Sequence, residues 1–147
     1  MKISVINGPN LNILGKREPT IYGTETLEDI SKMLLKKTKT FDIELEFYQS
    51  NHEGDIVDKI QSYGGISDGI ILNAAAYTHT SIAIRDAIAA INIPVVEVHL
   101  SNVNSREEFR KISYISSVCK GVISGFGANS YYLAVMALYD ILGGKYE

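Results

Sequence analysis

Residues 69–100 read GIILNAAAYTHTSIAIRDAIAAINIPVVEVHL, and this stretch decides the fold. The segments Gly69 to Leu72 and Val95 to Leu100 are almost continuously apolar, as parallel strands are when helices cover both faces of their sheet. Between them, apolar residues recur every three or four positions from about Ser81 to Ile91, which predicts a helix. We therefore expect a strand–helix–strand unit in the middle of a parallel sheet.

The same alternation continues on both sides of this unit. Thr26 can cap a helix that has Asp29 at its third position, and Gly64-Gly65 and Gly143-Gly144 are stop signals for two others. Five such units favour a flavodoxin-like three-layer α/β sandwich, with a five-stranded parallel sheet of order 2-1-3-4-5, over a closed barrel of eight units. The remaining expected strands are Ile3 to Ile6, Ile43 to Tyr48 and Gly121 to Ser124. Four further helices are expected: one that starts near Thr26, one that includes Ile56 to Tyr63, one that begins with a capping box at Ser105 to Glu108, and one from about Ser130 to Leu142.

Length and composition point to one cytoplasmic domain, 1–147. A net charge of -3 without a long basic run argues against nucleic acid as a partner. No apolar stretch reaches the roughly 18 residues that a membrane span needs, and the N-terminus lacks a signal-peptide pattern. The single cysteine, Cys119, can form no internal disulfide and no paired-cysteine metal site. We therefore expect no nucleic acid, no membrane and a cytoplasmic location.

The connection after the first strand is long for its position. Ligands of open α/β sheets bind beyond the carboxyl ends of the strands, and the segment at about 8–24 exceeds the usual length of such a loop. It follows Asn7 and contains Asn10, Arg17 and Tyr22. It is either a plain insertion or a lid over a site, and its polar residues favour the lid.

All three histidines, His52, His79 and His99, follow or end an expected strand. A metal site is one interpretation, but the three lack short ligand spacing and a companion carboxylate cluster. His52 also fits a hydrogen-bonded structural role. We therefore expect no metal.

Glu97 and His99 stand two apart on the fourth strand, so their side chains project from one face with Cα atoms roughly 7 Å apart. An unpaired buried carboxylate is strongly unfavourable, and a nearby imidazole offsets that cost while the carboxylate orients the ring. The two form either a structural ion pair or a general acid or base. Their place at the end of the strand favours the catalytic interpretation.

Tyr22 can act as a base only with help. The reference pKa of a tyrosine is about 10, so its phenolate needs about 3 units of stabilisation to work near pH 7. The guanidinium of Arg17 is a suitable partner, and Pro19 and Gly23 oppose a regular helix and hold both residues in the loop. Such pairs also occur as simple packing contacts, and both interpretations stay open at this point.

Three other motifs carry less weight. Gly125 to Ser130 resembles a dinucleotide-binding loop only loosely and fits a strand-to-helix turn better. A phospho-acceptor module would need aspartates where this chain has Asn7, Asn10 and Asn73. The sequence contains no nucleophile elbow and no Gly-x-x-x-x-Gly-Lys-Ser/Thr loop, which excludes the commonest hydrolase and nucleotide-binding functions.

Five sequence blocks together resemble type II 3-dehydroquinate dehydratase. They occur in the family's order over residues 7 to about 110: Asn7 to Asn12, Arg17 to Gly23, Gln49 to Gly54, Tyr77 to Ser81 and Glu97 to Asn102. The resemblance implies a flavodoxin-like enzyme that uses no metal or cofactor. It implies dehydration of 3-dehydroquinate to 3-dehydroshikimate in the shikimate pathway, by anti elimination through an enolate. It also implies a homo-oligomer, a dodecamer in which trimers assemble as a tetramer.

The resemblance further implies a role for individual residues. Tyr22 would take a proton from C2 while Arg17 stabilises its phenolate. His99, oriented by Glu97, would protonate the leaving C1 hydroxyl, and Asn10 would stabilise the enolate through water. The substrate would be held by the backbone N–H groups of Leu100 and Ser101, the Ser101 hydroxyl, Asn73, His79 and Arg110, with Asp86 reaching the site from a neighbouring subunit.

The chain departs from the family pattern at a few positions. Ala74-Ala75 stands where a glycine usually follows Asn73, Ser130 stands where glycine is common, and Leu100 replaces a more usual isoleucine. Ala75 could change the backbone angles of its loop. The alternative from another class is a catalytically silent small-anion or flavin-binding module, which bound flavin or absent turnover would reveal.

Overall fold

The computed structural model describes residues 1–16 and 18–146, and for Tyr22 only the backbone. Five strands form one parallel sheet in the order β2-β1-β3-β4-β5. The predicted flavodoxin-like order is confirmed, and β3 and β4, which are buried along their whole length, lie inside the sheet. The strands are β1 (Lys2–Asn7), β2 (Glu44–Gln49), β3 (Gly69–Asn73), β4 (Val95–His99) and β5 (Gly121–Ser124).

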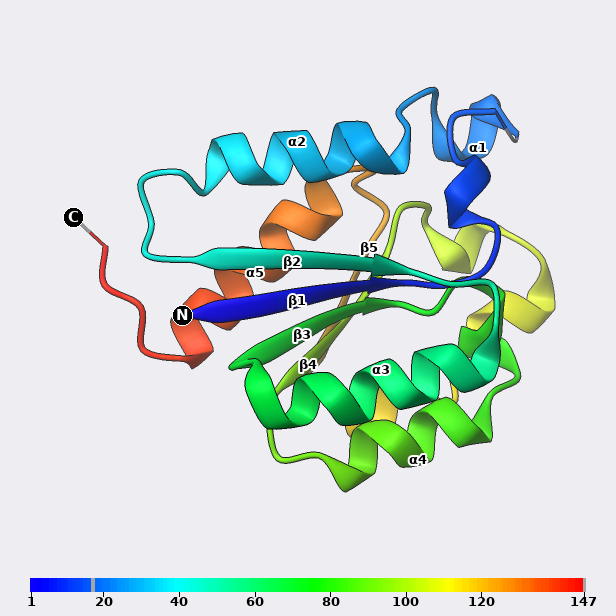
Figure 1. Ribbon diagram of the computed structural model, residues 1–147. Helices are drawn as coiled ribbons and strands as arrows, with labels where there is room; N and C mark the ends of the chain where they lie inside the picture. Colours follow the sequence, from blue (N-terminus) through cyan, green and yellow to red (C-terminus); the bar gives the residue numbers. More distant parts are fainter. Residues whose placement is uncertain (17, 147) are drawn as a thin grey trace.

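Helices cover both faces of the sheet and complete the three layers (Figure 1). On one face pack α2 (Leu27–Lys37) and α5 (Asn129–Ile141), and on the other α3 (Glu53–Ile66) and α4 (Ile82–Ala90). These bounds differ from the predicted ones mostly by a residue or two at the ends. In the part of the chain that the structure describes, no helix is long and apolar enough to span a membrane.

Each face of the sheet has its own apolar core because successive strand residues point to opposite faces. Ile3 and Val5 of β1 pack in the core under α2 and α5, whereas Ile6 packs in the core under α3 and α4. The predicted capping box at the start of α2 is also present. The Thr26 hydroxyl accepts a hydrogen bond from the Asp29 N–H at 3.1 Å, and the Asp29 carboxylate accepts one from the Thr26 N–H at 3.0 Å.

The end of α3 differs from the prediction. The helix continues through Gly64-Gly65 and ends at Ile66. A Cβ atom on Gly64 would lie 2.5 Å from Cγ2 of Ile91, so the close approach of the chain that follows α4 requires glycine here. The glycine therefore serves packing and does not terminate the helix.

The connection between β4 and β5 also differs from the prediction. Where a fourth helix beginning at Ser105 was expected, three short 3-10 helices occur: η3 (Val103–Ser105), η4 (Glu108–Lys111) and η5 (Ser116–Val118). Side-chain hydrogen bonds compete with helix formation, since the Asn102 Oδ1 accepts from the Asn104 N–H and the Ser105 hydroxyl donates to the Asn102 carbonyl. The predicted helix is wrong, and an irregular crossover replaces it.

The connection from β1 to α2 lies at the carboxyl ends of the strands (Figure 1). It contains η1 (Leu11–Ile13) and a single helical turn, α1 (Pro19–Tyr22). Pro19 is the first residue of this turn, a position that favours proline, and Gly23, which ends the turn, has a φ of 80°. Pro19 and Gly23 were expected to oppose a regular helix, and the helix that Pro19 begins and Gly23 ends is only one turn long. The predicted lid thus begins and ends in short ordered elements.

Candidate active site

A pocket opens beyond the carboxyl ends of the strands, where open α/β sheets bind their ligands. The connection after β1, η2 (Ala75–His79) after β3, and the segment after β4 all contribute to it. The pocket brings together most of the predicted site residues, although they lie far apart in the sequence. Those that line it are Asn10, Asn73, His79, His99, Leu100, Ser101 and Arg110, with Pro9, Leu11, Leu14, Ala75, Ala76, Val103 and Arg106 between them.

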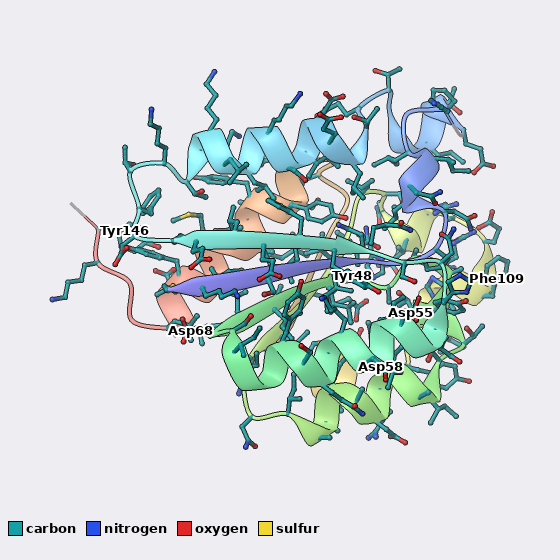
Figure 2. All side chains as sticks on the ribbon, in the orientation of Figure 1. Tyr48, Asp55, Asp58, Asp68, Phe109 and Tyr146 are labelled. Atoms are coloured by element: carbon teal, nitrogen blue, oxygen red, sulfur yellow. The ribbon has the colours of Figure 1, made fainter. Side chains whose placement is uncertain are left out.

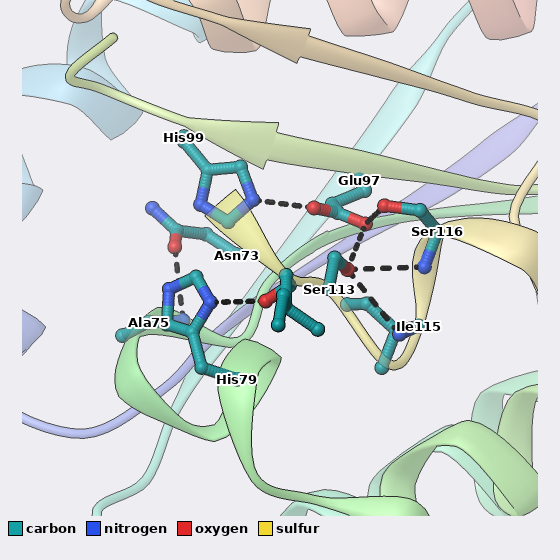
Figure 3. Close-up of polar contacts among 9 residues, drawn as sticks. Asn73, Ala75, His79, Glu97, His99, Ser113, Ile115 and Ser116 are labelled. Carbon is teal, nitrogen blue, oxygen red and sulfur yellow. Dashed lines mark hydrogen bonds and ion pairs between the residues drawn. The ribbon is translucent and has the colours of Figure 1, made fainter. Parts of the chain in front are cut away.

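The end of β4 carries a hydrogen-bonded pair, Glu97 and His99. Nε2 of His99 lies 2.5 Å from Oε2 of Glu97, and both residues are buried. The other carboxylate oxygen, Oε1, accepts hydrogen bonds from the hydroxyls of Ser116 at 2.6 Å and Ser113 at 3.0 Å (Figure 3). The contact expected from the two-residue spacing is therefore present, and two serines from the crossover complete it.

The surroundings of this pair favour an ionised carboxylate. Burial acts to raise the pKa of the Glu97 carboxyl and is the largest single influence, but the hydrogen bonds from His99, Ser116 and Ser113 together outweigh it, and the pKa lies below its ordinary value. A carboxylate can only accept, so Nε2 of His99 carries the hydrogen in their contact. Nδ1 is then the nitrogen that His99 can offer to a molecule in the pocket.

His79 is a second imidazole of the pocket. Its Nδ1 donates to the Ile112 carbonyl oxygen at 2.7 Å, and its ring stacks beside that of His99 with centroids 6.4 Å apart. Burial lowers the pKa of His79 and is the largest cause, with the backbone hydrogen bond opposing it. His79 is therefore suited to neutral hydrogen bonding.

Asn10 is held in the left-handed region, with a φ of 68°. Its N–H donates to Oδ1 of Asn51 at 2.9 Å, and the same oxygen accepts from Nε2 of Gln49 at 3.1 Å. Gln49 also donates to the Gly8 carbonyl at 3.1 Å. The end of β2 thus fixes the loop that carries Asn10.

Asn73 belongs to a buried chain of hydrogen bonds. Its Nδ2 donates to the Tyr131 hydroxyl at 2.9 Å, and that hydroxyl donates to Oδ1 of Asn7 at 2.6 Å. Its Oδ1 accepts from the Ala75 N–H at 3.1 Å. Ala75 has a φ of 51°, a conformation that favours glycine, so the departure from the family pattern leaves a strained alanine in the pocket wall.

The segment after β4 supplies the cationic side of the pocket. Nη1 of Arg106 donates to the Ser101 hydroxyl at 3.4 Å, and Arg110 forms an ion pair with Glu107. The hydrogen bond from Arg110 lowers the pKa of Glu107 and is the largest cause. Two guanidinium groups that line the pocket suit an anionic ligand.

Four predicted residues cannot be assigned to the lining of the pocket, namely Glu97, which lies behind His99, and Asp86, Arg17 and Tyr22. Asp86 lies on α4, where its exposed side chain pairs with Arg85 at 2.9 Å, and it does not line the pocket in this one chain. Arg17 and the side chain of Tyr22 lie outside the described residues. His52 is the N-cap residue of α3, where its exposed side chain makes no capping hydrogen bond, so the hydrogen-bonded structural role stays a prediction. Across residues 1–16 and 18–146, no group of three or more His, Cys, Asp or Glu side chains could hold a metal ion.

The structure adds contacts that the sequence analysis did not single out. Asn51 belongs to one of the five resemblance blocks, which was the available signal for it. Tyr131 gave no such signal because it fits the apolar face of a helix. Ser113 and Ser116 fall in the crossover where no strand or helix pattern indicated their direction.

Comparison with known proteins agrees with this geometry. The family model described as Dehydroquinase class II matches residues 1–139. A 3-dehydroquinate dehydratase of Nitratiruptor sp. is 60% identical over 141 residues, which is 96% of this chain and 90% of that protein. One from Campylobacter lari is 56% identical over 141 residues, 96% of this chain and 88% of that protein. The crystal structure of a type II dehydroquinase from Butyrivibrio crossotus superposes with a TM-score of 0.92 at 54% identity, covering 94% of this chain and 97% of that one. The chain belongs to the type II dehydroquinase family.

Proposed function

We propose that this protein dehydrates 3-dehydroquinate to 3-dehydroshikimate as a type II enzyme of the shikimate pathway. The observation that carries the proposal is the buried Glu97–His99 pair in a pocket that also holds amide, hydroxyl and guanidinium groups. An imidazole with a carboxylate behind it can supply a proton, and the other groups suit a small polyhydroxy acid. Family membership and the names of the relatives agree with this reaction.

The proposed reaction begins at the lid. The Tyr22 phenolate, stabilised by the Arg17 guanidinium, takes a proton from C2 beside the ketone. The electron pair of the broken C–H bond forms a double bond between C2 and the ketone carbon, and the π pair of the carbonyl moves to its oxygen, which gives an enolate. Asn10, whose backbone is fixed by Asn51, stabilises the enolate oxygen through a water molecule.

The second step expels the hydroxyl group. The enolate re-forms the ketone, its electron pair makes the C1–C2 double bond, and the C1–O bond breaks. His99, positively charged and paired with Glu97, gives its proton to the departing oxygen, which leaves as water. Acid and base act from opposite faces of the ring, which makes the elimination anti.

The proposed binding set surrounds the reacting carbons. Backbone N–H groups of Leu100 and Ser101, with the Ser101 hydroxyl, hold the carboxylate. Asn73, His79 and Arg110 hold the ring hydroxyls and the region of the carboxylate. These side chains line the same pocket, and one Asn73 amide hydrogen already fixes the group by bonding Tyr131, so the second can meet a substrate hydroxyl. The proposed chemistry uses no metal and no cofactor.

We also propose a homo-oligomer, a dodecamer of trimers assembled as a tetramer, in which Asp86 completes the site of a neighbouring subunit. The side chain of Asp86 is 65% exposed, which leaves it accessible to another copy. Large apolar side chains are exposed around it and on the crossover, namely Ile82, Phe109 (labelled in Figure 2) and Ile112. Light scattering should give the mass of twelve copies, and a fully active monomer of 16.2 kDa would contradict this proposal.

The test of the function is turnover of 3-dehydroquinate by the purified protein, followed by absorbance of the conjugated enone. Activity should survive exhaustive chelation and treatment with borohydride in the presence of substrate, because the proposed base forms no imine and the residues described around the pocket include no lysine. Absence of turnover, or loss of activity to either reagent, would refute the proposed reaction. A yellow protein that binds flavin would instead support the silent binding module.

A further inference from the structure

The crossover between β4 and β5 makes polar contact with one imidazole of the pocket, His79, and with Glu97, the carboxylate behind the other imidazole. The Ile112 carbonyl accepts from Nδ1 of His79, and one residue later the Ser113 hydroxyl reaches Glu97 behind His99 (Figure 3). The Tyr114 N–H donates to the Thr78 carbonyl at 2.9 Å, which ties the crossover to η2. The segment from Ile112 to Ser116 is therefore held against the pocket from behind.

The turn at Ser113 fixes the direction of its hydroxyl hydrogen. Oγ of Ser113 accepts from the N–H groups of Ser116 at 3.1 Å and Ile115 at 3.3 Å. With its lone pairs directed to these donors, the hydroxyl hydrogen is left for Oε1 of Glu97, 3.0 Å away. The Ser116 hydroxyl donates to the same oxygen at 2.6 Å. Two hydroxyl dipoles therefore point their positive ends at one carboxylate oxygen, while His99 occupies the other.

The carboxylate needs this support because it is buried. Glu97 is 1% exposed and lies 2.5 Å from Nε2 of His99. In such surroundings the proton of an imidazolium can pass to the carboxylate and leave two neutral groups, since burial disfavours both charges. Hydrogen bonds to the carboxylate oppose that transfer because they stabilise the ionised form alone.

The other titratable groups around the pair act differently. Burial, more than the nearby charge of Glu97, raises the pKa of Cys119 to about 12, so its thiol stays neutral. Burial likewise keeps His79 on the neutral side. Arg106 and Arg110 line the pocket, where an anionic substrate would meet them.

Resting on the proposed role of His99 as the acid, we propose that Ser113 and Ser116 are positioning residues of the reaction, which hold the Glu97 carboxylate ionised so that the proton stays on His99. They touch neither the pocket nor the substrate and act through Glu97. Removing one hydroxyl removes a positive dipole end from the pair, so the pair takes up its proton at a higher pH and the proton is shared more with Glu97.

Ser116→Ala is the main test because the Ser113 hydroxyl also closes the turn and its loss could disturb the fold. Titration of the His99 ring by NMR, with 13C-labelled histidine and His99→Ala to assign the signal, should show the midpoint raised by about half to one pH unit. Turnover at pH 7 should fall about three- to ten-fold with little change in KM. Ser116→Thr, which keeps a hydroxyl, should restore both values.

Ser31→Ala is the matched control, since the Ser31 hydroxyl donates to the Leu27 carbonyl within α2, away from the pocket. It should move neither the midpoint nor kcat. If the parent protein turns over 3-dehydroquinate but the His99 midpoint is unmoved in folded Ser116→Ala, the inference is overturned and the proposed function stands. If the midpoint is raised in Ser116→Ala but the parent protein does not turn over 3-dehydroquinate, the effect of Ser116 on the Glu97–His99 pair is supported and the proposed function is refuted.

Discussion

Replacing Glu97 by glutamine should remove most of the contribution of His99 as the acid, because the imidazolium loses the negative charge that stabilises it. Glutamine has nearly the same shape, so its carbonyl oxygen can still accept from the hydroxyls of Ser113 and Ser116. The negative charge 2.5 Å from Nε2 of His99 is lost. A hydrogen bond to a charged group contributes about 1.5–3 kcal/mol. Since about 1.36 kcal/mol corresponds to a tenfold change, kcat should fall roughly 10- to 150-fold.

Initial rates of enone formation across a range of pH measure this effect. KM should change much less than kcat, because the residues found to line the pocket do not include Glu97. Glu46→Gln is the matched control, since Glu46 lies on β2 and bonds Lys2 and Tyr63, so its loss should leave kcat unaltered. A folded Glu97→Gln enzyme with kcat within about two-fold of the parent would refute the reasoning about the pair.

Tyr22→Phe should lower kcat by at least about 10²-fold and abolish deuterium exchange at C2. His99→Ala should also lower kcat but keep that exchange. Exchange kept in Tyr22→Phe and lost in His99→Ala would reverse the roles of base and acid. Arg17→Ala should lower kcat and move the pH optimum upward, because a phenolate without its guanidinium reverts toward a pKa of about 10, and an unchanged kcat–pH profile would count against this. Ala75→Gly should stabilise the protein by roughly 1 kcal/mol, because it relieves the strain of a left-handed alanine. Thermal unfolding should show Tm higher by about 2–4 °C, and Ala76→Gly, which relieves no strain, should lower it.

The centre of the fold can be predicted from the sequence because its signals are local. The unit over residues 69–100 combines two apolar strands with a helix of regular periodicity, and both strands and α4 occur close to the expected bounds. The Thr26 cap is equally local, since its partner is three residues away. The end of α3 was predicted wrongly at Gly64 because the residue that requires a glycine there, Ile91, is distant in the sequence.

The candidate site can be predicted only as far as strand ends and close spacing allow. Glu97 and His99 are two residues apart on one strand, so their contact follows from strand geometry. The Tyr131 hydroxyl instead bonds Asn7 from 124 residues away, and the Ser116 hydroxyl bonds Glu97 across 19 residues of irregular chain. No periodicity reports such contacts, because they depend on how the crossover and α5 pack against the sheet.

The central claim is that this protein removes water from 3-dehydroquinate by anti elimination, with base and acid on opposite faces of the ring. The most direct test uses 3-dehydroquinate that carries deuterium at one or the other of the two C2 positions, with mass spectrometry of the product. The account predicts that the deuterium opposite the departing C1 hydroxyl is lost and that the other is retained. Loss of the deuterium on the same face as the hydroxyl would contradict it.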